Sequence, residues 1–146
     1  MVKIKIKKLN KNAIIPHYAH PGDAGMDLYS IEDLILKPGQ RHAISTGLSI
    51  AFPHGYAAMI CDKSGLAVKH GLTHIAGIID PEYRGEWKVV LLNTSDEDYY
   101  IKKAEKVAQV LFTKIEYMDV EEVEDLDKNT SRGDGGFGST GVKKHE

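Results

Sequence analysis

The sequence has little cysteine: Cys61 is the only one among 146 residues. A single cysteine excludes an intramolecular disulfide and favours a reducing compartment, for which we expect the cytoplasm. The sequence also has no run of 18 apolar residues and no signal-peptide pattern, so we expect no membrane partner. The net charge of −2 gives no strong field toward nucleic acid, which is not expected as a partner either.

What the sequence does contain is a series of short apolar or alternating segments separated by turn signals. Apolar residues make up 42% and charged residues 27%, which is typical of one globular domain. The first segment alternates Val2, Ile4 and Ile6 with lysines, the pattern of a half-buried strand. Further strands are expected at residues 42–52, 56–61, 87–92, 99–101 and 107–115. This spacing predicts an all-β barrel or sandwich.

One segment has a helical pattern, and the last part of the chain has no apolar pattern at all. Residues 63–70 are expected to form a short helix, with Ser64 as N-cap and Gly71 as its stop. Beyond about residue 126 the apolar residues become sparse. We therefore predict a β-barrel body over residues 1–126 and a flexible, glycine-rich C-terminal arm over residues 127–146.

The arm contains the segment SRGDGGFGSTG, residues 131–141, in which five glycines surround Phe137. Composition alone favours a disordered tail. Glycine amides, the hydroxyls of Ser139 and Thr140 and the guanidinium of Arg132 could instead bind phosphate. An aromatic side chain among glycines is also suited to stacking on a nucleobase.

Two carboxylates stand in turns where either a structural or a chemical role is open. Asp80 precedes Pro81, a combination that usually starts a turn, although a crowded site could use it as a general base. Asp27 lies in DAGMDLYS, which reads as a turn and strand but could also bind Mg²⁺, a metal that takes one or two carboxylates plus phosphates.

Taken together, five segments resemble the motifs of the trimeric dUTP pyrophosphatase (dUTPase) family, in that family's order. They are AGMDLYS (24–30), KSGLA (63–67), GIIDPEYRGE (77–86), KVAQVLF (106–112) and RGDGGFGSTG (132–141). The resemblance implies a β-clip or distorted jelly-roll-like subunit in a homotrimer with active sites at the subunit interfaces. It implies hydrolysis of dUTP to dUMP and pyrophosphate with Mg²⁺, a reaction that keeps uracil out of DNA and supplies dUMP for thymidylate synthesis.

The resemblance also implies roles for individual residues. Asp80 would deprotonate a water that attacks the α-phosphorus, and Tyr83 would lie against the deoxyribose and exclude a 2′-hydroxyl. Backbone groups of a hairpin over residues 74–79 would recognise the uracil edge, on which Phe137 would stack. Asp27 would hold Mg²⁺ through water. The remaining substrate contacts would come from Lys63, Ser64, Gly65, Gly77, Ile78, Ile79, Gln109, Arg132, Gly138, Ser139 and Thr140.

The sequence departs from the family pattern at two places. Asp62 and Lys63 stand where the second motif usually has proline and arginine, so bidentate phosphate binding is lost and Asp62 could repel phosphate. Ala104 and Glu105 stand where glycine and aspartate are common, which is expected to change a turn. Two alternatives stay open: an enzyme related to dCTP deaminase, and a catalytically silent dUTPase-like interaction module.

Overall fold

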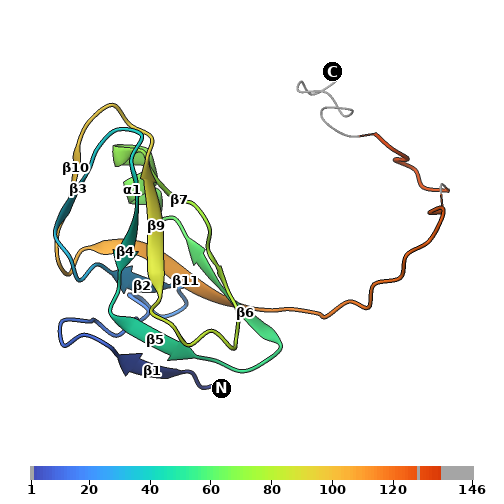
Figure 1. Cartoon of the computed structure of the whole chain (residues 1–146), viewed down its shortest axis with the longest axis horizontal. Helices are drawn as coiled ribbons and strands as arrows, with labels where there is room; N and C mark the ends of the chain where they lie inside the picture. The colour runs from blue at the N-terminus through green and yellow to red at the C-terminus, as the bar shows by residue number, and fades with distance from the viewer. Residues whose placement is uncertain (1, 128, 136–146) are drawn as a thin grey trace.

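The computed structural model describes residues 2–127 and 129–135, and its regular structure is almost entirely β (Figure 1). The elements, in chain order, are β1 (Lys5–Lys8), β2 (Met26–Tyr29), β3 (Leu34–Leu36), β4 (Arg41–Ser45), β5 (Leu48–Ala51), β6 (Tyr56–Cys61), α1 (Ser64–His70), β7 (Leu72–His74), β8 (Ile78–Ile79), β9 (Lys88–Asn93), β10 (Tyr99–Ile101) and β11 (Lys106–Lys114). The all-β prediction with one short helix is confirmed.

The strands form four small antiparallel sheets. The largest has the order β2-β11-β6-β8, and the next has the order β4-β9-β7. The pairs β1-β5 and β3-β10 make up the other two sheets. Over the described residues these sheets do not close into one continuous barrel, but their arrangement is consistent with a jelly-roll-like fold.

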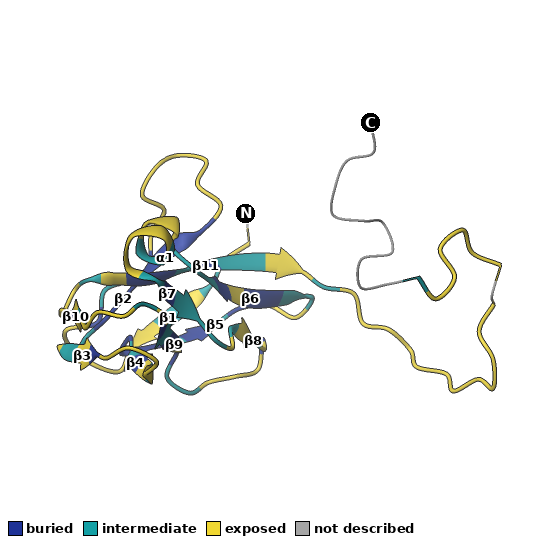
Figure 2. Ribbon diagram, turned by 90° about the horizontal axis from the view of Figure 1, so that it is seen from above, coloured by how far each residue is buried: buried dark blue, intermediate teal, exposed yellow. Residues whose placement is uncertain are grey.

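The buried hydrophobic residues come mainly from strands of all four sheets and form one core cluster. Figure 2 shows the buried segments of these strands in dark blue. The largest side chain of the core is the fully buried Trp87, which packs edge-on against Phe52 at 6.1 Å between ring centroids. The indole Nε1 of Trp87 is buried and has no hydrogen-bond partner among the described residues. Two other buried polar side chains are bonded: Thr46 Oγ1 donates to the carbonyl of Trp87 at 2.6 Å, and Asn93 Nδ2 donates to the carbonyl of Leu36 at 2.8 Å. Such bonding avoids the cost of burying unpaired polar groups.

One expected strand is in fact two strands that belong to different sheets. The alternating pattern over residues 42–52 predicts a single strand, but the chain bends at Gly47, which has a φ of +68°. Glycine tolerates this left-handed conformation because it has no Cβ. β4 therefore pairs with β9, and β5 pairs with β1.

The helix prediction was correct in place but wrong in its N-cap. α1 begins at Ser64 itself, and the N-cap is Lys63, which makes no side-chain capping bond. The predicted stop is confirmed, since Gly71 has a φ of +63° and its amide closes the helix onto Ala67. α1 has no buried residue and lies on the surface. No helix among the described residues is long and apolar enough to cross a membrane.

After β11 the described part of the chain forms no further strand or helix. Residues 116–127 are exposed and, with residues 129–135, run away from the β-rich body in Figure 1. The division into a body over residues 1–126 and an arm over residues 127–146 stays a prediction.

Candidate active site

The predicted site residues of the body fall into two groups, one at each edge of the β2-β11-β6-β8 sheet. We call the first the lysine–aspartate cluster, which consists of Asp27, Lys63, Ser64, Gly65, Lys106 and Gln109. We call the second the Asp80 cavity, which is lined by Ile78, Ile79, Asp80, Tyr83, Glu86, Trp87 and Lys88.

Strand pairing brings the lysine–aspartate cluster together. Asp27 on β2 is in register with Gln109 on β11, and Gln109 is in register with Cys61 on β6. Gln109 Nε2 donates to the carbonyl oxygen of Asp62 at 2.9 Å. A Cβ at Gly25 would lie 2.7 Å from Gln109 Oε1 and 3.2 Å from Gln109 Cβ, so glycine allows Gln109 to pack closely against this turn. The strand register thus places Asp27 of AGMD and Gln109 of KVAQ side by side, although they are far apart in the sequence.

The carboxylate of Asp27 is buried and bound by two ammonium groups. Lys63 Nζ contacts Oδ1, and Lys106 Nζ contacts Oδ2 at 2.7 Å. Burial alone would raise the pKa of Asp27, but the hydrogen bonds and charges of Lys106 and Lys63 outweigh it and hold the pKa below its usual value. Asp27 is therefore ionised, and its charge is compensated within the chain.

Beside this ion pair, the first turn of α1 borders an open, cationic cavity. The cavity has a volume of about 400 Å³ and is lined by Lys63, Gly65, Leu66, Lys69, His70, Glu105 and Lys106. Ser64 and Gly65 are exposed, and a Cβ at Gly65 would meet nothing within 4 Å. A bulky anion can therefore approach the main chain at Gly65.

The Asp80 cavity has a volume of about 490 Å³ and is different in character. Asp80 is exposed, and its carboxylate has no hydrogen bond or ion pair to any other described residue. Its carbonyl oxygen accepts from the amide of Tyr83 at 3.1 Å, so the turn expected at Pro81 is present. The turn holds the main chain and leaves the carboxylate open toward the cavity.

Tyr83 lies in the same cavity and is fixed at its hydroxyl end. The hydroxyl donates to the carbonyl of Glu86 at 3.2 Å, while the side chain remains 47% exposed. A Cβ at Gly85 would collide with the Tyr83 ring, so Gly85 allows this close approach. One face of the ring is thereby available to a ligand.

The hairpin over residues 74–79 is anchored to strands on both sides. The amide of Ile60 donates to the carbonyl of Gly77 at 2.8 Å, and the amide of Ile75 donates to the carbonyl of Val90 at 2.9 Å. Between these anchors Ala76 has a φ of +66°, which is unusual for a residue with a side chain. Ile78 is exposed and Ile79 half-buried on β8, which pairs with β6.

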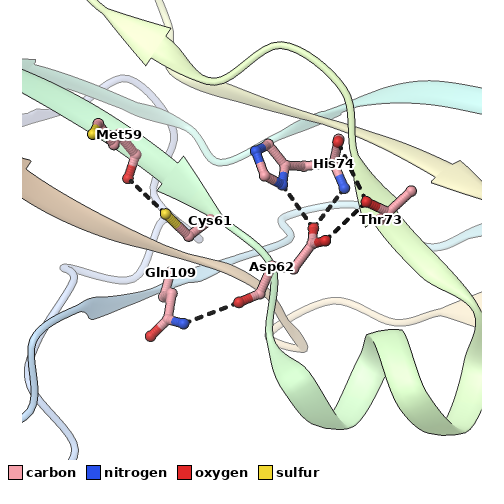
Figure 3. A network of polar contacts seen from close by, with 6 residues as sticks. All are labelled: Met59, Cys61, Asp62, Thr73, His74 and Gln109. Atoms are coloured by element: carbon pink, nitrogen blue, oxygen red, sulfur yellow. Dashed lines mark hydrogen bonds and ion pairs between the residues drawn. The ribbon is translucent and has the colours of Figure 1, made fainter. Parts of the chain in front are cut away.

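Asp62, which was expected to repel phosphate, does not line the cationic cavity beside α1. Figure 3 shows it bonded to the strand β7 instead: Oδ1 accepts from the amide of His74 at 2.6 Å, and Oδ2 accepts from Thr73 Oγ1 at 2.8 Å. Ring nitrogen Nδ1 of His74 lies 2.7 Å from Oδ1. The negative charge of Asp62 is thus engaged by neighbouring donors.

Within one chain the carboxylates of Asp27 and Asp80, one from each group, lie at opposite edges of the sheet. β2 and β8 are the opposite edge strands of a four-stranded sheet, so three strand spacings, about 14 Å, separate them. The carboxylates of Asp27 and Asp80 therefore cannot both touch one phosphate group of a ligand bound to a single chain.

The arm is not brought to either group in the described residues. Arg132 is exposed, and its Nε donates to the carbonyl of Gly135 at 2.7 Å, a local contact. Phe137, Gly138, Ser139 and Thr140 lie outside the described residues.

Sequence reasoning missed two features of the site. Lys106 begins the fourth motif, but no short-range pattern links it to Asp27, which is 79 residues away. Thr73 and His74 were likewise not connected with Asp62. The contacts of Asp62 could have been suggested by two observations: Thr73 and His74 are polar residues at the start of the predicted hairpin, and Asp62 is a carboxylate that directly follows a strand.

Comparison with known proteins gives one consistent result. The dUTPase family model matches residues 11–141. A deoxyuridine 5′-triphosphate nucleotidohydrolase of Nautilia profundicola is 51% identical and covers 96% of this chain and 99% of its own length. A protein of the same name from Clostridioides difficile is 47% identical, with 97% and 99% covered. The solved dUTPase of Staphylococcus bacteriophage 80alpha with dUPNHPP superposes with a TM-score of 0.90 at 29% identity, covering 96% and 99% of the two chains.

Proposed function

The chain belongs to the dUTPase family, and on this premise we propose how its residues carry out the hydrolysis of dUTP. It is a hydrolase that acts on dUTP. The observation that carries this conclusion is the match of the family model to residues 11–141, which include all five motifs. The products we propose are dUMP and pyrophosphate.

Asp80 is proposed as the general base. Its carboxylate is exposed, lines a cavity of about 490 Å³ and has no competing partner among the described residues. A base must be within hydrogen-bond reach of the water it activates, and an engaged carboxylate would not be available. Asp80 would take a proton from the water that attacks the α-phosphorus, and the pyrophosphate would leave from the opposite side.

Tyr83 and the hairpin over residues 74–79 are proposed to select the nucleoside. The exposed ring of Tyr83 would pack against the deoxyribose and leave no space for a 2′-hydroxyl. Main-chain groups of Gly77, Ile78 and Ile79 would bind the uracil edge. A wrong base leaves polar groups unpaired, at about 1–3 kcal/mol each, so such recognition can be sharp.

The lysine–aspartate cluster is proposed to hold the triphosphate. Lys63 supplies a positive charge, the hydroxyl of Ser64 and the amide of Gly65 supply donors, and Gln109 lies on the neighbouring strand. The leaving pyrophosphate gains negative charge during the reaction, and fixed donors aimed at that charge lower the barrier.

Asp27, whose two carboxylate oxygens are bound by Lys63 and Lys106, is proposed to hold a magnesium ion that arrives with the nucleotide. The described residues contain no group of three histidine, cysteine or acidic side chains that could hold a metal. Mg²⁺ commonly keeps several waters and is bound by one or two carboxylates plus phosphates, which matches a single Asp27. Asp27 would hold the ion through its water shell, and the ion would supply charge neutralisation on the phosphates.

A homotrimer with interfacial active sites is proposed because one chain does not bring the two groups together. The separation of about 14 Å across the sheet leaves Asp80 and Asp27 at different edges, so a second copy would supply the missing group. The arm would close over the nucleotide, with Arg132, Ser139 and Thr140 on the phosphates, Gly138 beside them and Phe137 on uracil. The cytoplasmic location expected from the single cysteine stays a prediction.

The experiment that tests the function measures the products formed from each deoxynucleoside triphosphate with Mg²⁺. Pyrophosphate from dUTP alone is expected. Ammonia from dCTP would indicate a deaminase-related enzyme, and no turnover of any nucleotide would indicate a silent module.

A further inference from the structure

Asp62 connects the two regions of the site through its own bonds. Its carbonyl oxygen accepts from Gln109 Nε2 at 2.9 Å, on the side of the lysine–aspartate cluster. Its carboxylate accepts from the His74 amide at 2.6 Å and from Thr73 Oγ1 at 2.8 Å, where the hairpin over residues 74–79 begins. Asp62 therefore contacts both Gln109, which is proposed to bind phosphate, and His74, the first residue of the hairpin (Figure 3).

The protonation of this group follows from its surroundings. Burial raises the pKa of Asp62, but the hydrogen bonds from His74 and Thr73 outweigh burial and hold the pKa below its usual value. An ionised carboxylate can only accept hydrogen bonds. Nδ1 of His74, 2.7 Å from Oδ1, therefore carries a hydrogen and donates it to Asp62.

The hairpin has a conformation that needs such support. Ala76 has a φ of +66°, a left-handed conformation that is unfavourable for a residue with a Cβ. The His74 ring also lies close over Gly77, because a Cβ there would be 3.0 Å from Cδ2 and 3.1 Å from Nε2 of the ring. Moving the ring would alter the space over Gly77, a residue proposed to bind uracil.

We propose that Asp62 is a positioning residue for base recognition, which holds His74 and through it the hairpin over residues 74–79 in the shape that binds uracil. This inference rests on the proposed function of that hairpin. Asp62 does not touch the reacting atoms. Its loss should therefore change substrate affinity and base selectivity more than the rate of the bound complex.

The test compares Asp62→Asn with wild type and with the matched control Asp33→Asn. Asparagine offers one acceptor oxygen, and its amide nitrogen would face a donor, so the three contacts cannot all be kept. Asp33 is also bonded, accepting from the amide of Lys103 at 2.8 Å and pairing with its ammonium, but it lies outside the two groups of the site. His74→Phe is the second variant, since it keeps a ring over Gly77 and removes the Nδ1 donor.

For Asp62→Asn we expect the KM for dUTP to rise about tenfold and the preference for dUTP over dCTP to fall about tenfold. We expect kcat to stay within about twofold, and amide hydrogens of residues 73–79 to exchange faster than in wild type. His74→Phe should change KM in the same direction by about threefold, and Asp33→Asn should change neither KM nor selectivity.

Two results would overturn the inference: unchanged KM, selectivity and exchange in Asp62→Asn, or a loss confined to kcat. If Asp62→Asn does not fold, a wild-type KM and selectivity in His74→Phe overturns it instead. Failure of wild type itself to hydrolyse dUTP would overturn the proposed function, and is thereby distinguished from failure of this inference.

Discussion

Asp27 and Asp80 are the same residue type in two contrasting environments. Asp27 is 5% exposed and has a lysine on each carboxylate oxygen, from Lys63 and Lys106. Asp80 is exposed in a cavity, and no other described residue bonds its carboxylate. The first carboxylate is a fixed, compensated charge, whereas the second is available to a small molecule.

This contrast predicts that Asp27 contributes to both stability and activity, whereas Asp80 contributes to activity alone. Removing the charge of Asp27 should affect stability as well as metal-dependent activity, because two lysines lose their partner. Removing the charge of Asp80 should affect turnover alone, because nothing in the described fold depends on it. The same aspartate-to-asparagine change at the two positions therefore probes the comparison directly.

The largest effect is expected for Asp80→Asn. An amide cannot take a proton from water, so kcat should fall by about 10³–10⁴-fold, while the Kd for a non-hydrolysable dUTP analogue and the thermal midpoint stay near wild type. Steady-state kinetics and calorimetric titration measure these quantities. The matched control is Glu82→Gln, an exposed carboxylate two residues away that pairs with His54 at 3.3 Å. An active Asp80→Asn protein removes Asp80 as the base.

The next effect is expected when residues 131–146 are deleted. The deletion removes the proposed phosphate and uracil contacts of the arm, so kcat/KM should fall by about 10²–10³-fold. The thermal midpoint should not change, since the arm makes only local contacts in the described residues 129–135. Wild-type kinetics in the truncated protein would contradict a role for the arm in catalysis.

Asp27→Asn should show a combined loss. We expect kcat/KM to fall by about 10²-fold, with more Mg²⁺ needed for half-maximal activity. We also expect the free energy of unfolding to fall by about 1–3 kcal/mol, as for a lost charged hydrogen bond. Asp33→Asn, at an exposed pair, should leave the free energy of unfolding close to that of wild type. Equal stability of the two variants would contradict the compensated-charge account.

The pH dependence of stability should also report the compensated charge of Asp27. The pKa of Asp27 is lower in the folded protein than its usual value of 3.8, so its stabilisation is complete above about pH 4 and is lost as the pH falls through the folded pKa. Chemical denaturation at a series of pH values from 6 downward should therefore show that acid lowers the free energy of unfolding less in Asp27→Asn than in wild type. An acid-induced loss in Asp27→Asn as large as that of wild type would contradict the compensated-charge account.

The smallest effect concerns a turn beside the lysine–aspartate cluster. Ala104, at the position where glycine is common, has a φ of +65°, so the left-handed conformation is retained with an alanine. Ala104→Gly should raise the free energy of unfolding by about 0.5–1 kcal/mol without changing kcat, as measured by denaturant titration. A destabilised variant would show that the Ala104 methyl group contributes packing that exceeds the strain.

The strands that were predicted correctly can be recognised from a few consecutive residues of the sequence. The strands expected at residues 56–61 and 107–115 correspond to β6 (Tyr56–Cys61) and β11 (Lys106–Lys114), because their apolar patterns and flanking turns are visible in the sequence. The turn and short strand expected in DAGMDLYS are present, although β2 shows no alternation because all four of its residues are buried. The split of residues 42–52 depends on a sheet change at Gly47 that only the tertiary pairing reveals.

The sequence predicts a set of site residues but not the bonds that these residues make in the fold. Asp27 and Asp80 were both identified from their motifs, yet their different environments come from partners far away in sequence. Lys63 lies 36 residues after Asp27, and the Asp62–His74 bond spans 12 residues through a helix. Such contacts depend on strand register, which no local pattern specifies.

The most direct test of the central claim, that Asp27 and Asp80 of one site come from different chains, is a mixing experiment. Asp80→Asn and Asp27→Asn chains are unfolded together at equal amounts, refolded and assayed with dUTP. Random trimers would contain intact sites at about a quarter of the wild-type number, so about a quarter of wild-type activity is predicted. Activity no greater than that of the separately refolded variants would contradict the claim and place both carboxylates of a site on one chain.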